Sequence, residues 1–458
     1  MTVPASLARP LREITTEIAH DDRRVALYAD LAAHRDRQEP TLRAFEARRE
    51  VCPDLAAAPL NGLPITVKDQ IAVAGWPRGF GLERPPRHRD AASAAVVARL
   101  QALGAVVTGK TALPPNALDF QTYNRRRGFT GNPHDPQVTA GGSSGGGAAA
   151  VASGMSLLDV GADLAGSLRL PAGWCGVSSL TPTEGALSGD GMLQGSQSLD
   201  HFARIGFIAQ RARDLSFVWS LLQPRSTPIH AMQDAPRIAV WAPEGHPFCD
   251  ADTHAAWTSV PTQLSQAGLG VDPDPMTWLL APDMYRLAGE IIGYETGALI
   301  PAPIRWLMRR DHGAARRSPG FVAHIHDGYR RDRARYAQNL DLLQMVRSQA
   351  LARCGHMDAL ILPVTGICAF RHIKPMRDRS GVRDYDQQFA TLAGPLPYFD
   401  ALTRFTLPLT LLGWPVVTIP LGRDRNGIPI GAQIVGKPHT EPALLGLAET
   451  LACVFDAD

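Results

Sequence analysis

Residues 141–176 read "GGSSGGGAAAVASGMSLLDVGADLAGSLRLPAGWCG", a long stretch made mostly of glycine, serine, alanine and apolar residues. A Gly/Ser tract is by itself typical of a flexible linker. Here it runs directly into the Ala-rich "AAAVASG", which favours a helix. It then enters an apolar stretch that carries Asp163 and Arg169. We therefore predict that the tract packs inside a fold and does not link two folds.

Composition limits the classes of protein that this chain can belong to. With 458 residues, 45% apolar content and 20% charged content, the chain can bury a large core, as one large unit or two fused ones. Lys and Arg number 46 against 44 Asp and Glu, so the formal net charge is only +2. This balance argues against nucleic acid or an anionic membrane surface as the partner.

The cysteines and the first residues indicate a compartment. Neither the density of a disulfide scaffold nor the Cys-x-x-Cys pairs of a zinc site occur among the six cysteines, Cys52, Cys175, Cys249, Cys354, Cys368 and Cys453. The N-terminal "MTVPASLARPLREITTE" lacks the apolar core of a signal peptide. We therefore expect reduced thiols in a cytoplasmic protein.

One uncharged apolar run, Phe405 to Gly422, is long enough to raise the question of a membrane span. Its prolines, Pro408, Pro415 and Pro420, argue against one continuous helix. We expect short buried strands with turns in this run, and no membrane.

Hydrophobic periodicity predicts an α/β protein. A charged helical pattern extends from about Ala5 to Glu50, "LPITVKDQIAV" indicates a strand that passes into a turn, and "AASAAVVARLQALG" followed by "AVVTG" indicates a helix and a strand. Long Arg-rich helices are predicted between about Ala251 and Arg353, and strands at "DALILPV" and "GIPIGAQIVG". The alternation is typical of a layered α/β domain.

Serine chemistry needs a base, because a serine hydroxyl is a poor nucleophile until its proton is removed. His324 and His326 lie far in sequence from the serines, in the Arg-rich region, and we interpret them as part of a solvated helix face. No Gly-x-Ser-x-Gly elbow and no P-loop is present. Lys68 ends an apolar strand, where desolvation can remove its charge, although an ion-paired surface lysine is the alternative.

Three motifs taken together resemble the amidase signature family, whose serine hydrolases use a Ser-Ser-Lys triad. They are "LPITVKDQIAVAG", "GGSSGG" and "GADLAGSLRLPAGWCG", in which Ser143 follows Lys68 by 75 residues and Ser167 follows Ser143 by 24. The loop "YNRRRGFTGNPHDP" and the C-terminal "GIPIGAQIVGKP" also fit. The resemblance extends from about Ala5 to Phe455.

The resemblance implies a role for each residue of these motifs. Ser167 would be the nucleophile, Ser143 the bridging serine after a cis bond from Gly142, and Lys68 the base. Backbone N–H groups of Leu164, Ala165, Gly166 and Ser167 would form the oxyanion hole, and Ser144, Asp163 and Arg169 would support it. Neutral Lys68 would take a proton through Ser143 as Ser167 attacks an amide or ester carbonyl, without a metal or cofactor.

The resemblance also implies an architecture and a partner. It predicts one domain over residues 1–458, an α/β/α layered fold with a large central mixed sheet surrounded by helices. Residues 68–176 would hold the core motifs, and the helical region at about 251–353 would be an insertion on the substrate side. The partner would be a small-molecule amide or ester, with a homodimer left open. Arg125, Arg126 and Arg127 would either be solvated or line the entrance and favour a carboxylate or phosphate.

Two alternatives to a free-standing amidase stay open. A glutaminase subunit of a tRNA-dependent amidotransferase shares the triad, but commonly carries glutamine where this chain has Leu170. A binding protein, or a biosynthetic enzyme that makes an amide from the acyl-enzyme, is suggested by departures from the family pattern. Leu164 and Ala165 replace a small polar residue and glycine, "GKTALPP" lacks the usual Asn and Glu, and "GFIAQ" replaces a usual Gly-Pro.

Overall fold

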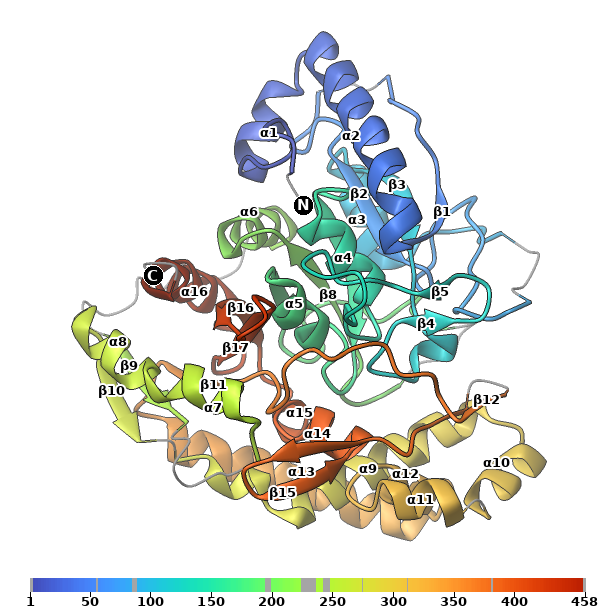
Figure 1. Cartoon of the computed structure of the whole chain (residues 1–458), viewed down its shortest axis with the longest axis vertical. Coiled ribbons are helices and arrows are strands. Elements are labelled where there is room, and N and C mark those ends of the chain that lie inside the picture. Colours follow the sequence, from blue (N-terminus) through green and yellow to red (C-terminus); the bar gives the residue numbers. More distant parts are fainter. Residues whose placement is uncertain are drawn as a thin grey trace.

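The computed structural model describes residues 3–54, 57–84, 89–193, 199–223, 236–241, 248–273, 275–310, 312–379 and 382–455. Its centre is a mixed sheet of 11 strands (Figure 1). In spatial order these are β1 (Phe45–Arg48), β3 (Val106–Thr111), β2 (Pro64–Lys68), β6 (Leu158–Asp163), β8 (Arg204–Ala209), β7 (Ser178–Thr181), β16 (Val416–Arg423), β17 (Pro429–Val435), β11 (Ala359–Pro363), β9 (Arg237–Val240) and β10 (Gly270–Pro273). The predicted large mixed sheet is confirmed.

Helices surround this sheet, as the sequence predicts. Those of the first half are α1 (Leu11–Glu17), α2 (Asp21–Leu42), α3 (Ala95–Ala102), α4 (Gly145–Ala152), α5 (Arg169–Cys175) and α6 (Ala212–Leu222), with the short 3-10 helix η1 (Pro115–Ala117). Those of the second half are α7 (Ala251–Thr258), α8 (Val260–Gln266), η3 (Thr277–Leu280), α9 (Pro282–Thr296), η4 (Gly297–Leu299), α10 (Ala302–Arg309), α11 (His312–Arg317), α12 (Val322–Gly328), α13 (Arg333–Cys354), α14 (Tyr398–Thr403), α15 (Thr406–Leu412) and α16 (Glu441–Phe455).

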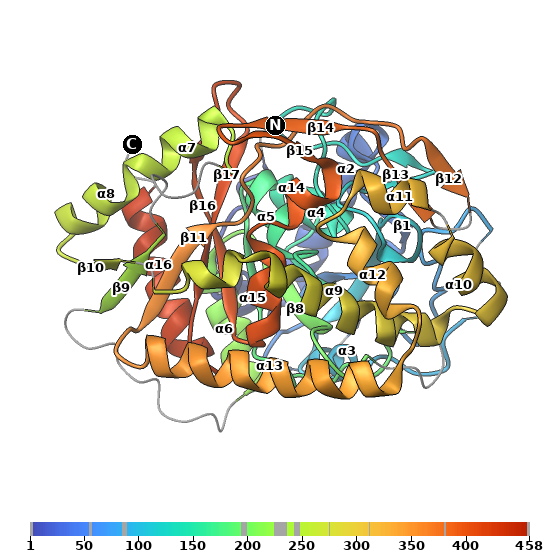
Figure 2. The same ribbon diagram turned by 90° about the horizontal axis from the view of Figure 1, so that it is seen from below.

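Three two-stranded sheets complete the described structure. They are β4 (Tyr123–Asn124) with β5 (Gly128–Phe129), β12 (Arg377–Arg379) with β13 (Val382–Asp384), and β14 (Gln388–Thr391) with β15 (Gly394–Pro397). Figure 2 shows α13 running along one edge of the molecule, beside the group of helices from α9 to α12.

The two faces of the sheet pack against different helices because strand residues alternate between the faces. On β8, Ile208 packs in a cluster with the alanines of α4, whereas Ile205 and Phe207 belong to the larger core that includes Leu215 of α6. Helix α4 therefore covers one face in the middle of the sheet, and α6 covers the other.

The register of two neighbouring strands positions the candidate site. β2 and β6 run parallel, with Thr66 opposite Asp159. Because parallel strands end at the same edge of a sheet, the last residues of these strands, Lys68 and Asp163, lie on the same side of the fold.

The expectation of short strands throughout residues 405–422 is wrong in its first half. Thr406–Leu412 form helix α15, and only from Val416 onward does the chain become strand β16. Pro408 is the third residue of α15, where the missing N–H would have no helical acceptor, so the helix tolerates it. Gly413 ends the helix with φ +66°. Pro420 fits the strand because the register of β16 shifts between Pro420 and Gly422.

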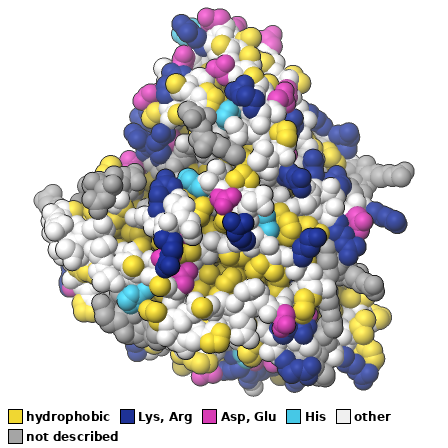
Figure 3. Space-filling view, in the orientation of Figure 1, with side chains coloured by type: hydrophobic (Ala, Val, Ile, Leu, Met, Phe, Trp, Pro, Cys, Tyr) yellow, Lys and Arg dark blue, Asp and Glu magenta, His cyan; other side chains and the backbone are white. Residues whose placement is uncertain are grey.

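None of the helices that the structure describes is both long and apolar enough to cross a membrane. On the face shown in Figure 3, basic and acidic side chains are interspersed. This mixture agrees with the formal net charge of +2.

Candidate active site

Lys68 ends strand β2 with its side chain completely buried. Its Nζ lies 2.7 Å from Ser143 Oγ and 3.4 Å from the carbonyl oxygen of Ala162. Burial lowers the pKa of Lys68 to about 7, and the negative charges of Asp163 and Asp159 oppose this shift without cancelling it. A substantial share of Lys68 is therefore neutral near pH 7 and able to accept a proton.

The glycine- and serine-rich tract forms a tight loop followed by helix α4. The Gly142–Ser143 peptide bond is cis, and Ser143 is 1% exposed. The first turn of α4 fits closely over β6, because a Cβ at Gly147 would lie only 2.0 Å from Asp159 Oδ2. The glycines of the tract thus allow helix and sheet to approach each other at the site, which supports the prediction of a packed segment.

A second loop, residues 164–168, connects β6 to α5 and carries Ser167. Asp163 holds this loop, because its carboxylate accepts hydrogen bonds from the N–H groups of Gly166 (2.8 Å) and Leu168 (3.0 Å). The N–H of Ser144 donates to the carbonyl oxygen of Ser167 at 3.1 Å, so the two serine loops lie side by side.

Arg169 fixes the carboxylate that holds this loop. Both side chains are fully buried, and Arg169 donates to Asp163 from Nε (3.1 Å) and Nη2 (2.9 Å). Burial acts to raise the pKa of Asp163, but the ion pair with Arg169 outweighs burial and holds this pKa well below its usual range. The pair thus stays charged and keeps the loop in one conformation.

The oxyanion hole implied by the resemblance needs one correction. The N–H of Gly166 already donates to Asp163, with φ of +120°, so it is directed away from a reacting carbonyl. Within the described chain, the N–H groups of Leu164, Ala165 and Ser167 have no protein acceptor. Ala165 is absent from the described residues with positive φ, so its methyl group narrows the site without straining the backbone.

Sequence reasoning overlooked Asp159, which is fully buried four residues before Asp163 in the same strand. Its Oδ1 accepts hydrogen bonds from Thr66 (2.7 Å) and Thr111 (3.0 Å), and burial raises the pKa of Asp159 to about 6. The signal was present, since an acidic residue inside an apolar strand is costly to bury without a purpose.

Residues from the C-terminal part of the chain also hold the loop of Ser167 by hydrogen bonds, and no local sequence pattern predicts these contacts. Thr406 Oγ1 donates to the carbonyl oxygen of Ala165 at 2.6 Å. Arg169 Nη1 donates to the carbonyl oxygen of Thr406 at 3.0 Å and to Gln433 Oε1 at 3.3 Å. These contacts bridge about 240 positions of sequence, so only the fold reveals them.

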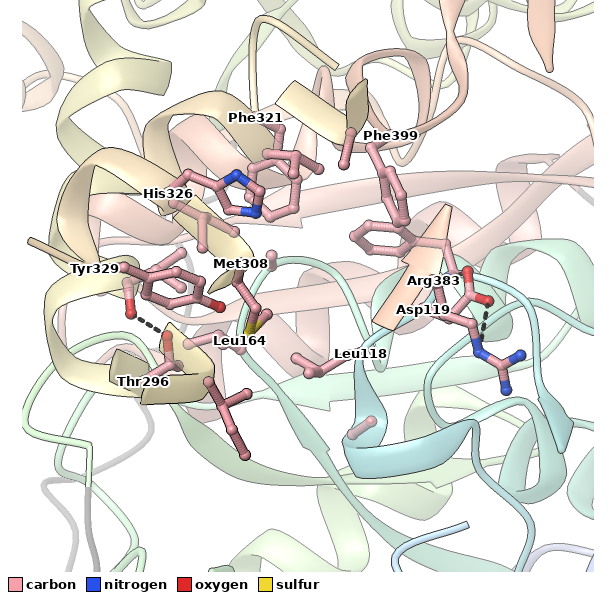
Figure 4. A pocket seen from close by; sticks show the side chains of 18 of the residues that line it. Leu118, Asp119, Leu164, Thr296, Met308, Phe321, His326, Tyr329, Arg383 and Phe399 are labelled. Carbon is pink, nitrogen blue, oxygen red and sulfur yellow. Dashed lines mark hydrogen bonds and ion pairs between the residues drawn. The ribbon is translucent and has the colours of Figure 1, made fainter. Parts of the chain in front are cut away.

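Ser167 opens onto a cavity of about 1060 Å³. Figure 4 shows Leu118, Met308, Phe321 and Phe399 around it. At one end Arg383 Nε lies 3.8 Å from Asp119 Oδ2. Burial raises the pKa of Asp119 to about 6, although hydrogen bonds from Tyr385 and Tyr398 oppose the shift.

His326 lies at the other end of this cavity, on α12 (Figure 4). The interpretation of this histidine as part of a solvated helix face is therefore wrong. The side chain of His326 lines the cavity, and its ring stacks on the ring of Tyr329, with the ring centroids 5.7 Å apart. His324 is half-buried on the same helix.

The three consecutive arginines separate, because they lie in the hairpin of β4 and β5. Arg125 lines the cavity and lies 3.8 Å from exposed Glu83. Arg126 and Arg127 instead turn toward Glu46, whose side chain is 2% exposed, and do not line the cavity. Of the two alternatives, lining the entrance fits Arg125 alone, and Arg126 and Arg127 fit neither, since the buried carboxylate attracts them.

We expect Arg126→Ala to lower the free energy of unfolding by about 1–2 kcal/mol, because it removes a partner of a buried carboxylate. Chemical denaturation measures this change. Arg125→Ala is the matched control: Glu83, which Arg125 approaches, is exposed, so the free energy of unfolding should change by less than about 0.5 kcal/mol. If Arg126→Ala changed the ratio of kcat/KM for anionic substrates to kcat/KM for neutral substrates, Arg126 would line the entrance after all.

The chain is similar to several known proteins. A family model described as Amidase matches residues 31–445. The chain is 30% identical to the 2-amino-5-chloromuconic acid deaminase of Comamonas testosteroni, over 93% of this chain and 91% of that protein. It is 28% identical to a glutamyl-tRNA(Gln) amidotransferase subunit of Cyanothece sp., over 85% of this chain and 83% of that protein.

Solved structures of amide hydrolases have the same fold as this chain. A crystal structure of an amidase superposes with a TM-score of 0.79 at 25% identity, covering 98% of this chain and all of that one. The 6-aminohexanoate cyclic dimer hydrolase in complex with its substrate superposes with a TM-score of 0.80 at 22% identity, covering 98% and 97%.

Proposed function

The chain belongs to the amidase family and is a hydrolase of C–N amide bonds, and we propose that it acts through an acyl-enzyme on Ser167. The observation that carries this proposal is the 2.7 Å contact between a fully buried lysine and Ser143, in a loop bonded directly to the loop of Ser167. A buried lysine with a lowered pKa is a suitable general base.

In the proposed reaction, the proton of Ser167 moves to Ser143 as the proton of Ser143 moves to Lys68. Ser167 Oγ then bonds to the carbonyl carbon of the substrate, and the N–H groups of Leu164, Ala165 and Ser167 stabilise the oxyanion. The relay returns the proton to the leaving nitrogen as the C–N bond breaks. Water attacks the acyl group in the same way and releases the acid, which restores Ser167.

We also propose that the chain is a single domain and that its helical region at about 251–353 forms the substrate side. This is supported by the cavity wall, to which α9, α10 and α12 contribute Ile292, Met308 and Ile325. The proposed partner is a small-molecule amide or ester and not nucleic acid. A reducing, cytoplasmic location is supported by the six scattered cysteines, which have neither the density of a disulfide scaffold nor the spacing of a zinc site.

A panel of amides and esters tests this proposal. Hydrolysis of one or more of them by the wild-type protein, lost in a Ser167 variant, would support it. The panel should include glutamine with ammonia detection, because relatives include amidotransferase subunits. Glutamine-dependent ammonia release with a copurifying partner would favour the glutaminase alternative, and amide synthesis from an acyl donor and an amine would favour the biosynthetic one.

We expect Ala165→Gly to preserve or increase kcat/KM for small model esters, by about severalfold, because the methyl group of Ala165 narrows the site and its removal leaves the oxyanion donors in place. Removing the methyl group widens a site in which Ala165 is 5% exposed and lines the cavity. Steady-state kinetics on phenyl acetate checks this expectation. A large loss of activity with unchanged thermal unfolding would mean that the alanine shapes the site for another reaction.

A further inference from the structure

The cavity beside Ser167 is walled mainly by apolar side chains, and several of them are more exposed than is usual for such residues. Only eleven large hydrophobic side chains of the described chain are exposed, and four of these, Leu118, Ile304, Leu307 and Met376, line this one cavity. An apolar surface that stays open to solvent around a cavity marks a binding site for an apolar group.

Two of the polar residues that line the cavity, Asp119 and Thr296, already have hydrogen-bond partners in the protein. Asp119 accepts hydrogen bonds from Tyr398 (3.0 Å) and from Tyr385. Thr296 donates to the carbonyl oxygen of Ile292 at 2.6 Å. A polar substrate would have to compete with these contacts, whereas an apolar one gains from leaving water.

Two of the arginines that line the cavity, Arg383 and Arg310, also contact other residues of the protein. Arg383 Nη2 donates to the carbonyl oxygen of Tyr123 at 2.8 Å, and Arg310 stacks on the ring of Trp306 at 3.8 Å. Their charges therefore have neighbours of the protein itself, which favours apolar contacts over ion pairing as the source of affinity.

The sequence next to the nucleophile agrees with this. Leu164 and Ala165 precede Ser167 and both line the cavity, and Figure 4 shows Leu164 close to Met308. The chain thus has apolar side chains at two cavity-lining positions just before the proposed nucleophile.

Building on the proposed function, we propose that the substrate is an amide that carries a bulky apolar group, aryl or alkyl of several carbons, which fills the cavity formed by α9, α10, α12 and residues 117–120. Small amides such as acetamide would leave most of about 1060 Å³ unfilled. The apolar group selects the substrate, and the Ser167 chemistry is the same for every acyl group.

Two matched substrate series test the proposal: p-nitrophenyl esters of acids from two to eight carbons, and N-alkyl acetamides with the same range of chains. In the esters Ser167 Oγ bonds to the acyl carbon, p-nitrophenolate leaves, and water then releases the acid. We expect kcat/KM in at least one series to rise by up to about fourfold per methylene until the cavity is filled. Hydroxide-catalysed rates correct for intrinsic reactivity.

Matched variants connect the effect to the cavity. Leu118→Ser should reduce the ratio of kcat/KM for the longest and shortest chains by about threefold to tenfold. Met308→Ser, at a second wall position shown in Figure 4, should do the same. Leu351→Ser is the control, because Leu351 is 44% exposed, close to the 47% of Leu118, and does not line the cavity.

The outcomes separate the two proposals. Ser167-dependent hydrolysis without any rise along either series would overturn the apolar substrate and leave the nucleophile in place. A faster reaction of chains that end in a carboxylate than of neutral chains of equal length would also overturn it. Absence of Ser167-dependent hydrolysis for every compound would overturn the proposed function itself.

Discussion

Ser167→Ala is expected to abolish covalent labelling and to lower amide and ester hydrolysis on the order of 10⁴-fold or more. The reason is that Ser167 Oγ is the proposed attacking atom, so its removal leaves no group that can hold the acyl intermediate. The fold should persist, since the change removes one oxygen atom from a side chain that is 9% exposed.

Intact mass spectrometry after incubation with a reactive aryl ester or a fluorophosphonate probe measures the labelling. Wild type should gain the mass of one adduct, and Ser167→Ala should gain none. Ser220→Ala, in which an exposed serine on α6 is changed, is the control and should label like wild type. An adduct of undiminished yield on Ser167→Ala would show that another residue is the nucleophile.

Much of this site could be predicted from the sequence because its chemistry lies in short motifs. Lys68 ends strand β2, Ser167 lies in the loop after β6 and Ser143 lies just before helix α4, and the structure brings the two serine loops into direct contact. The strands at residues 358–364 and 427–436 were predictable as well, since buried strands are continuous apolar runs.

What sequence reasoning missed depends on contacts between distant segments. Thr406, in a run expected to be strand, lies in helix α15 and donates to the carbonyl of Ala165. The turn of Arg126 toward Glu46 brings together residues 80 positions apart, and Glu46 is positioned by the pairing of its strand β1 with β3. The direction of the Gly166 N–H depends on one backbone angle, and no pattern of residue types specifies it.

The neutral form of Lys68 is the other feature with a large expected effect. We expect kcat/KM of the wild-type protein to rise with pH and to level off above about pH 7, because burial lowers the pKa of Lys68 to about 7 and only the neutral amine accepts a proton. Below that pH the rate should fall about tenfold per unit. Lys68→Met, which keeps most of the side-chain volume, should lower kcat about 10³-fold and remove this limb of the profile.

The stability of Lys68→Met distinguishes a catalytic base at position 68 from a lysine that only stabilises the fold. The unfolded chain keeps the Lys68 proton up to its ordinary pKa of 10.5, whereas the native protein releases it near pH 7, so this group's contribution to the free energy of unfolding rises with pH between those values. At neutral pH the buried amine therefore costs stability, and Lys68→Met should unfold at the same or a higher temperature than wild type.

Lys110 provides the matched control for this experiment. It is a second fully buried lysine, on the neighbouring strand β3, with its pKa lowered to about 8 and its Nζ bonded to the carbonyl oxygen of Ile71 and not to a serine. Lys110→Met should keep the limb near pH 7, because Lys68 still faces Ser143. If both variants lost activity equally, or if Lys68→Met unfolded far below wild type, the lysine beside Ser143 would be holding the fold together and the proton acceptor would have to be sought elsewhere. A loss of activity confined to Lys68→Met, with the fold intact, leaves proton transfer as the physical reason for a fully buried lysine at this position.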